Sequence, residues 1–168
     1  MKKKTQINIF SENIHTKIEI DEKKAINVAK KLLTHFLNTE NILKDSCLDS
    51  LNFNCISFDI LYCDNEKTLE INKDYREKDY PADIITFAIF ADSEEKFIFD
   101  GEINLGEMII SLDKVEDNAK EKSTSSTDEL YFLISHGIMH LLGFDHQTIE
   151  EYTFIVEAQN TALLGIKD

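Results

Sequence analysis

Three of the five histidines of this chain fall within eleven residues, and their spacing constrains the local fold more than any other feature. His136 and His140 are four residues apart, which places both imidazoles on one face of a helix, about one turn apart. Gly143 then lets the chain turn back in a left-handed conformation, so that His146 can approach the same point. The segment predicts a helix, a tight turn and a shared metal site.

The donor set indicates which metal this site takes. Imidazole-only sites suit zinc, and three nitrogen ligands leave the fourth tetrahedral position open for water, as in catalytic zinc sites. We therefore expect one zinc ion per chain, held by His136, His140 and His146. Asp145 has two interpretations, because its carboxylate could orient an imidazole or cap the turn. The two remaining histidines are expected to be structural or solvent-facing.

Length and composition favour a single domain. The chain has 168 residues, of which 42% are hydrophobic, and this suffices for a core without disulfides. The three cysteines match no metal spacing and suggest a reducing compartment. No apolar stretch has the length of a signal peptide or of a membrane span. We expect residues 1–168 to form one cytoplasmic domain.

Hydrophobic periodicity predicts an α+β fold, with a mixed sheet of four to five strands packed against helices. Strands are expected at 6–12, 53–62, 84–90 and 108–112, with a short apolar piece at 97–99, and helices at 21–37, 64–75, 113–120, 126–143 and 148–164. Gly101 and Gly106 are expected to bracket a connection before the last strand. Capping boxes, Ser126 with Glu129 and Thr148 with Glu151, are expected to open the last two helices.

The charge balance narrows the class of partner. With 32 acidic and 18 basic residues the net charge is −14, which argues against nucleic-acid binding through a broad basic face. A small anion site stays open, because Arg76 is the sole arginine and can grip a phosphate with two parallel N–H groups. The alternative for Arg76 is a surface ion pair with an acidic neighbour. Lys73 and Lys78 flank it as weaker candidates.

The histidine spacing also occurs in metzincin peptidases, which place a glutamate directly after the first histidine as general base. Gly137 stands at that position here and cannot shuttle a proton. A zinc peptidase or other hydrolase is therefore the weaker alternative. A third possibility is a non-catalytic assembly factor with a structural zinc.

Three blocks of the sequence together carry a family resemblance. Residues 136–146, HGIMHLLGFDH, resemble the motif H-G-x-x-H-L-x-G-x-D-H of the YbeY family of bacterial rRNA-maturation endoribonucleases. Residues 71–87 are similar to that family's block L-N-x-x-Y-R-x-x-D-x-P-T-D-V-L-S-F, and residues 105–110 to its L-G-D-I-x-I strand. The chain departs from these patterns at Ala82, Glu107 and Phe144, where Thr, Asp and Tyr are usual.

The resemblance implies a zincin-like α+β fold, with zinc on His136, His140 and His146 and with Arg76, His136 and His140 as catalytic residues. It also implies a zinc-dependent, single-strand-specific endoribonuclease that matures the 3′ end of 16S rRNA and serves ribosome quality control. The implied partners are single-stranded ribosomal RNA and small-subunit ribosomal proteins or an assembly GTPase, without DNA or membrane. Because the net charge repels RNA, we expect partners to present the substrate. Zinc-bound water and the RNA 2′-hydroxyl both stay open as the attacking group.

Overall fold

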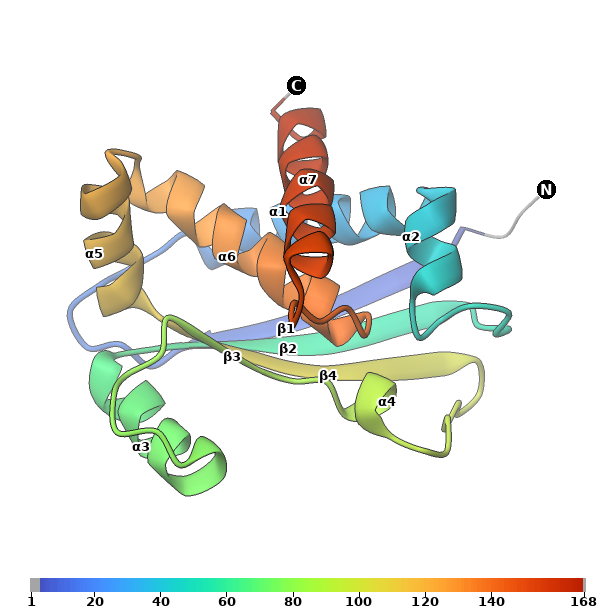
Figure 1. Cartoon of the computed structure of the whole chain (residues 1–168), viewed down its shortest axis with the longest axis horizontal. Helices are drawn as coiled ribbons and strands as arrows, with labels where there is room; N and C mark the ends of the chain where they lie inside the picture. Colours follow the sequence, from blue (N-terminus) through green and yellow to red (C-terminus); the bar gives the residue numbers. More distant parts are fainter. Residues whose placement is uncertain (1–3, 168) are drawn as a thin grey trace.

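The computed structural model describes residues 4–167, and within them the strands form one mixed sheet in the order β1-β2-β4-β3 (Figure 1). The strands are β1 (Gln6–Asn13), β2 (Cys55–Cys63), β3 (Ile84–Phe87) and β4 (Glu102–Ser111). β1, β2 and β4 run parallel, and β3 pairs antiparallel with β4 at one edge. This arrangement confirms the predicted α+β class and the mixed sheet of four strands.

Helices cover the two faces of the sheet unequally. They are α1 (Glu22–Leu37), α2 (Glu40–Asp45), α3 (Asn65–Arg76), α4 (Ile89–Asp92), α5 (Leu112–Lys122), α6 (Ser126–Leu141) and α7 (Ile149–Gly165). α1, α6 and α7 lie over one face, and α3 lies on the opposite side (Figure 1). No helix in residues 4–167 has the length and apolar character needed to cross a membrane.

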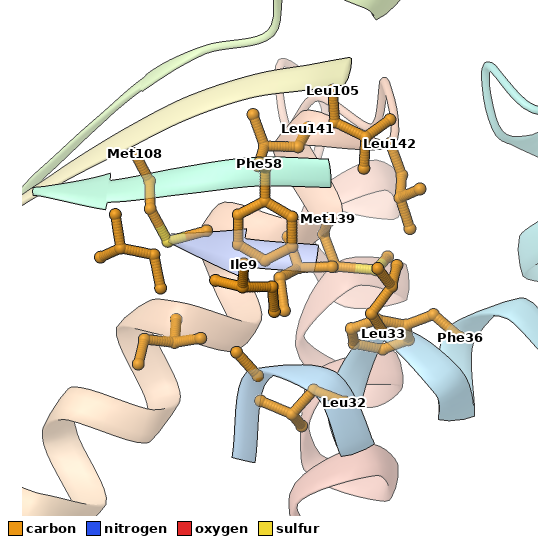
Figure 2. Packing of buried hydrophobic residues seen from close by; sticks show 14 of the residues in the cluster. Ile9, Leu32, Leu33, Phe36, Phe58, Leu105, Met108, Met139, Leu141 and Leu142 are labelled. Atoms are coloured by element: carbon orange, nitrogen blue, oxygen red, sulfur yellow. The ribbon is translucent and has the colours of Figure 1, made fainter. Parts of the chain in front are cut away.

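The main core lies between the sheet and the helices α1 and α6. Figure 2 shows Phe58 of β2 and Met108 of β4 pointing toward Leu33 of α1 and Met139 of α6. Each of these four side chains is almost fully buried, and burial of one such side chain contributes about 1.5 to 3 kcal/mol. This packing fixes the position of α6 over the sheet.

A smaller cluster holds α3 against the other face. Ile71 of α3 packs with Cys63, Ile85 and Ile109 from three different strands. Alternation along β2 explains this division, because Phe58 faces the main core whereas Cys63 faces α3. The cluster places the end of α3, with Arg76, beside β3.

Two predicted strand boundaries are wrong. The run expected as a strand over 84–90 leaves the sheet after Phe87 and enters the short helix α4. Lys96 stabilises the short helix α4, because its ammonium group donates hydrogen bonds to three carbonyl oxygens at the end of this helix, at 2.7 to 2.9 Å. The piece at 97–99 forms only an isolated bridge from Phe99 to Glu102.

The last strand begins earlier than expected, at Glu102 instead of residue 108. Gly106 does not bracket a connection but lies inside β4, where the register with β2 shifts as in a β-bulge. Its φ of +126° suits glycine, and a Cβ at this position would collide with the carbonyl oxygen of Phe87. The helix α2 was not predicted from the sequence.

Candidate metal centre

The helix α6 ends in the turn that the sequence predicts. Gly143 has a φ of +97°, and its N–H donates to the carbonyl oxygen of His140 at 2.9 Å. The N–H of Phe144 donates to the carbonyl oxygen of Met139 at 3.1 Å. These two bonds form a Schellman motif, which satisfies the last carbonyl groups of the helix and turns the chain back over it.

The start of α6 differs from the prediction by one residue. Ser125, not Ser126, caps the helix, and its hydroxyl accepts the N–H of Asp128 at 3.0 Å. The third helical position is then Asp128, so the predicted capping box of Ser126 and Glu129 does not form, and the buried carboxylate of Glu129 pairs with Lys122 at 3.0 Å. At the start of α7, the predicted capping box of Thr148 and Glu151 is confirmed.

The three histidines of the motif meet where α6 and the following turn converge. The Nε2 atoms of His136 and His140 lie 2.9 Å apart. His146 faces both rings, and one candidate ligand atom from each of the three residues lies within 4.8 Å of the others. Because two nitrogens on one tetrahedral zinc lie about 3.3 Å apart, this donor set fits a single metal ion.

The surroundings keep the two helical imidazoles neutral. Burial, assisted by the nearby imidazoles of His136 and His146, lowers the pKa of His140 to about 4. Burial also lowers the pKa of His136, against the effect of its hydrogen bond with Gln159. At neutral pH each of these rings therefore carries a nitrogen lone pair, which is the form that binds a metal.

The structure distinguishes the two interpretations of Asp145. Its carboxylate accepts the N–H of His146 at 2.8 Å and the side-chain amide of Gln147 at 2.9 Å. These two bonds lower the pKa of Asp145. Within residues 4–167 its carboxylate makes no hydrogen bond to an imidazole, so Asp145 caps the turn that carries His146.

The partner that orients an imidazole is instead Gln159 of α7, a residue that the sequence analysis did not single out. Its side-chain oxygen lies 3.1 Å from Nδ1 of His136, and the residue is fully buried. A sequence signal existed, because Gln159 stands between Ile155 and Ala162 on the buried face of α7. A polar residue in an apolar stripe needs a buried partner.

The histidines line one wall of a cavity of about 750 Å³, and Arg76 lines it from the end of α3. The guanidinium Nη1 of Arg76 contacts the side-chain oxygen of Asn72 at 3.4 Å. Asn72 is fully buried and donates from its amide to the carbonyl oxygen of Tyr80 at 2.8 Å. Within residues 4–167 Arg76 makes no ion pair with an acidic side chain.

Two lysines join Arg76 in the cavity wall, Lys78 and Lys114, whereas Lys73 does not line the cavity and pairs with Asp79 at 3.1 Å. The wall also holds the carboxylates of Asp83, Asp92 and Asp145. Three cations and three carboxylates make the wall formally neutral, whereas the chain as a whole carries a net charge of −14.

The position after the first histidine leaves no room for a general base. A Cβ on Gly137 would lie 2.9 Å from Cδ1 of Ile84 and 3.0 Å from Cε of Met108. Gly137 therefore lets α6 pack closely on the sheet. A glutamate at this position would enter the core, so the metzincin arrangement does not fit this backbone.

Comparisons with known proteins agree with the motif blocks. The model of the family described as endoribonuclease YbeY matches residues 10–167. A protein of Geobacillus sp. (strain WCH70) named endoribonuclease YbeY is 37% identical over 144 residues, which cover 84% of this chain and 86% of the relative. One of the same name from Fusobacterium nucleatum is 34% identical and covers 92% and 91%.

A solved structure shares the fold. The solution structure of a protein from Thermotoga maritima superposes with a TM-score of 0.57 at 22% identity, covering 94% of this chain and 87% of the other. At this identity the likeness concerns the arrangement of helices and strands alone.

Proposed function

The chain belongs to the endoribonuclease YbeY family, and from this premise we propose that it is a zinc-dependent endoribonuclease specific for single-stranded ribosomal RNA. The membership supports the RNA-cleaving role. Our extension is the metal, the maturation of the 3′ end of 16S rRNA and a part in ribosome quality control. One observation carries the proposal: three clustered imidazoles and the sole arginine line the same cavity.

Different residues of the cavity bind the metal, bind the phosphate and orient the arginine. His136, His140 and His146 would hold zinc, which supplies a Lewis acid that polarises a phosphodiester oxygen. Arg76 donates two N–H groups to the non-bridging oxygens and stabilises the charge that develops in the transition state. Asn72 holds one edge of the guanidinium and leaves its other donors for the phosphate.

The charge distribution supports the proposed specificity for a single strand. Lys78 and Lys114 stand with Arg76 in the cavity wall and balance its three carboxylates, whereas the chain as a whole is strongly acidic. A flexible single strand can place one or two phosphates in the cavity, but a rigid duplex would bring many phosphates near the acidic surface. We propose that small-subunit ribosomal proteins or an assembly GTPase present the RNA, in the cytoplasm.

Two other functions are less well supported. A peptidase of metzincin type needs a carboxylate after the first histidine, and Gly137 is packed against Ile84 and Met108. A purely structural zinc gives no reason for Arg76 to line the same cavity without an ion pair to an acidic side chain of residues 4–167.

The test offers the purified protein an RNA that carries the 3′ end of 16S rRNA as a single strand, the same sequence as a duplex, and casein. We expect cleavage of the single strand alone, its loss with a chelator and its return with zinc. The control is His140→Ala purified in parallel, which must be inactive if a contaminating nuclease is absent. Casein cleavage, or RNA cleavage that survives chelation, contradicts the proposal.

A further inference from the structure

Gln159 joins α7 to the candidate metal centre through three hydrogen-bonded groups. Its amide nitrogen lies 3.2 Å from the carbonyl oxygen of Phe132 and 2.9 Å from the hydroxyl of Ser135. The Ser135 hydroxyl in turn donates to the same carbonyl oxygen at 2.7 Å. On its other side, the oxygen of Gln159 faces Nδ1 of His136 at 3.1 Å.

These partners determine which terminal atom of the Gln159 amide is the oxygen and which is the nitrogen. The carbonyl oxygen of Phe132 can only accept a hydrogen bond, so the Gln159 atom beside it must be the nitrogen. The hydroxyl proton of Ser135 is already used toward Phe132, so its oxygen accepts from the same nitrogen. A flipped amide would set its oxygen against the carbonyl oxygen of Phe132, acceptor against acceptor.

The fixed amide then fixes the tautomer of His136. The Gln159 oxygen can only accept, so Nδ1 of His136 must carry the proton. In a neutral imidazole the other nitrogen then carries the lone pair. That nitrogen, Nε2, is the atom that faces Nε2 of His140.

We propose that Gln159 is a positioning residue, which holds His136 in the Nδ1–H tautomer and so presents Nε2 to the metal. The inference rests on the metal site of the proposed function. Metal-binding histidines usually donate their second ring N–H to such a partner, and loss of that partner weakens metal binding about 10- to 100-fold. Gln159 does not itself line the cavity and acts only through His136.

The tautomer can be measured without any variant. In the chelated wild-type protein, labelled with ¹⁵N, long-range ¹H–¹⁵N spectra should show His136 with its proton on Nδ1. A proton on Nε2 overturns the inference. Because the protein is free of metal, this result does not depend on whether the metal site exists.

Variants then test the link to metal binding. Gln159→Met keeps the volume but removes the acceptor, and it should weaken Co²⁺ and Zn²⁺ binding about 10- to 100-fold. Ile155→Val, on the same buried face of α7, is the matched control and should leave affinity unchanged.

The outcomes separate the two ideas. If the wild type binds neither Zn²⁺ nor Co²⁺, the metal site of the proposed function fails, whatever the tautomer spectrum shows. If the wild type binds and Gln159→Met binds equally well, only the role of Gln159 fails. If Ile155→Val weakens metal binding as much as Gln159→Met does, the loss comes from disturbed packing of α7 and not from the lost acceptor, and the inference is overturned.

Discussion

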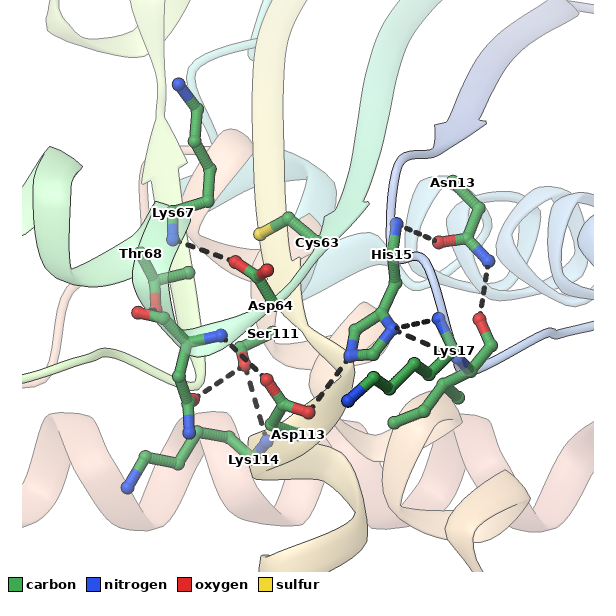
Figure 3. A network of polar contacts seen from close by, with 12 residues as sticks. Asn13, His15, Lys17, Cys63, Asp64, Lys67, Thr68, Ser111, Asp113 and Lys114 are labelled. Carbon is green, nitrogen blue, oxygen red and sulfur yellow. Dashed lines mark hydrogen bonds and ion pairs between the residues drawn. The ribbon is translucent and has the colours of Figure 1, made fainter.

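Nε2 of His15 lies 2.9 Å from a carboxylate oxygen of Asp113, a residue 98 positions later in the chain (Figure 3). Nδ1 of His15 accepts the backbone N–H groups of Lys17 and Ile18, each at 3.0 Å. The second oxygen of Asp113 accepts the N–H of Asn65 at 2.8 Å. One buried histidine and one carboxylate thus join the segment after β1 to the starts of α3 and α5.

Removal of this carboxylate should destabilise the fold. Asp113→Ala leaves the ring N–H of His15 and the N–H of Asn65 without their acceptor, and we expect the free energy of unfolding to fall by about 1.5 to 3 kcal/mol. Denaturant unfolding of the wild type and the variant at pH 7 measures the difference. A change below about 0.5 kcal/mol, the range of ordinary surface substitutions, would show that the network adds little.

The same contacts make the free energy of unfolding depend on pH. Burial alone would raise the pKa of Asp113, but the hydrogen bonds from His15 and from the N–H of Asn65 outweigh it and lower the pKa below the ordinary 3.8. A carboxylate with a lowered folded-state pKa stabilises the protein above its unfolded-state pKa and loses that effect as the pH falls through the folded-state value. The stability gap between wild type and Asp113→Ala should therefore narrow below pH 3.8. A constant gap between pH 5 and pH 2 would contradict this assignment.

A second stability prediction concerns Tyr62, which is fully buried and whose hydroxyl has no hydrogen-bond partner among residues 4–167. Because an unsatisfied buried hydroxyl costs about 1 to 3 kcal/mol, Tyr62→Phe should raise the free energy of unfolding by about 1 kcal/mol. The matched control is Tyr75→Phe, at an exposed tyrosine whose ring stays in place. Destabilisation by Tyr62→Phe would mean that the hydroxyl has a partner, such as a buried water.

The centre of the fold was predictable because its signals are local. The repeat of apolar residues, the spacing of His136 and His140, and Gly143 all lie within one helix and its turn. Local propensity and tertiary structure agree there. The family resemblance rests on the same short blocks, and the family model confirms it.

The sequence predictions fail where contacts between residues far apart in the chain determine the local structure. The run from Ile84 to Phe90 is apolar except for Thr86, and its change to the helix α4 depends on the ammonium group of Lys96 and on the bulge at Gly106. The role of Gln159 depends on how α7 packs against α6, 23 residues from His136. No periodicity within a single segment contains that information.

Metal content should follow the histidine cluster. We expect one zinc ion per wild-type chain, and His136→Ala and His140→Ala should each lose it, because two ligands rarely hold zinc. Added zinc should raise the melting temperature of the wild type, since a ligand that binds only the folded state stabilises it. His35→Ala is the control, because His35 lies outside the cluster and its variant should keep the metal. Full metal content in both cluster variants would exclude the site.

RNA affinity should depend only weakly on salt. Arg76, Lys78 and Lys114 are the cations of the cavity wall, and three phosphate contacts with a single strand predict a slope of log affinity against log salt of about −2. Binding of a short single-stranded RNA, measured across a series of salt concentrations with His140→Ala to prevent cleavage, gives the slope. A slope of about −5 or steeper would require some seven contacts and thus a basic surface elsewhere.

The last prediction separates charge from geometry at Arg76. Arg76→Lys should keep the fold and the metal, because the side chain is exposed and its one hydrogen bond within residues 4–167 is to Asn72, at 3.4 Å. Lysine keeps the positive charge, so long-range attraction for RNA is preserved, but it cannot donate two parallel N–H groups to one phosphate. If the guanidinium stabilises the transition state more than it stabilises the bound ground state of the RNA, Arg76→Lys lowers the turnover rate and not the RNA affinity.

We expect turnover of Arg76→Lys to fall about 10- to 100-fold with little change in RNA affinity, which is the effect of losing one strong charged hydrogen bond. Lys73→Gln is the matched control, since Lys73 pairs with Asp79 outside the cavity and its variant should cleave normally. Zinc content, melting temperature, affinity and cleavage rate are measured on the same samples. Undiminished cleavage by Arg76→Lys would show that the guanidinium does not contribute to catalysis. A large fall in melting temperature would assign Arg76 a structural role, because a residue that acts only on the transition state leaves the unfolding equilibrium unchanged.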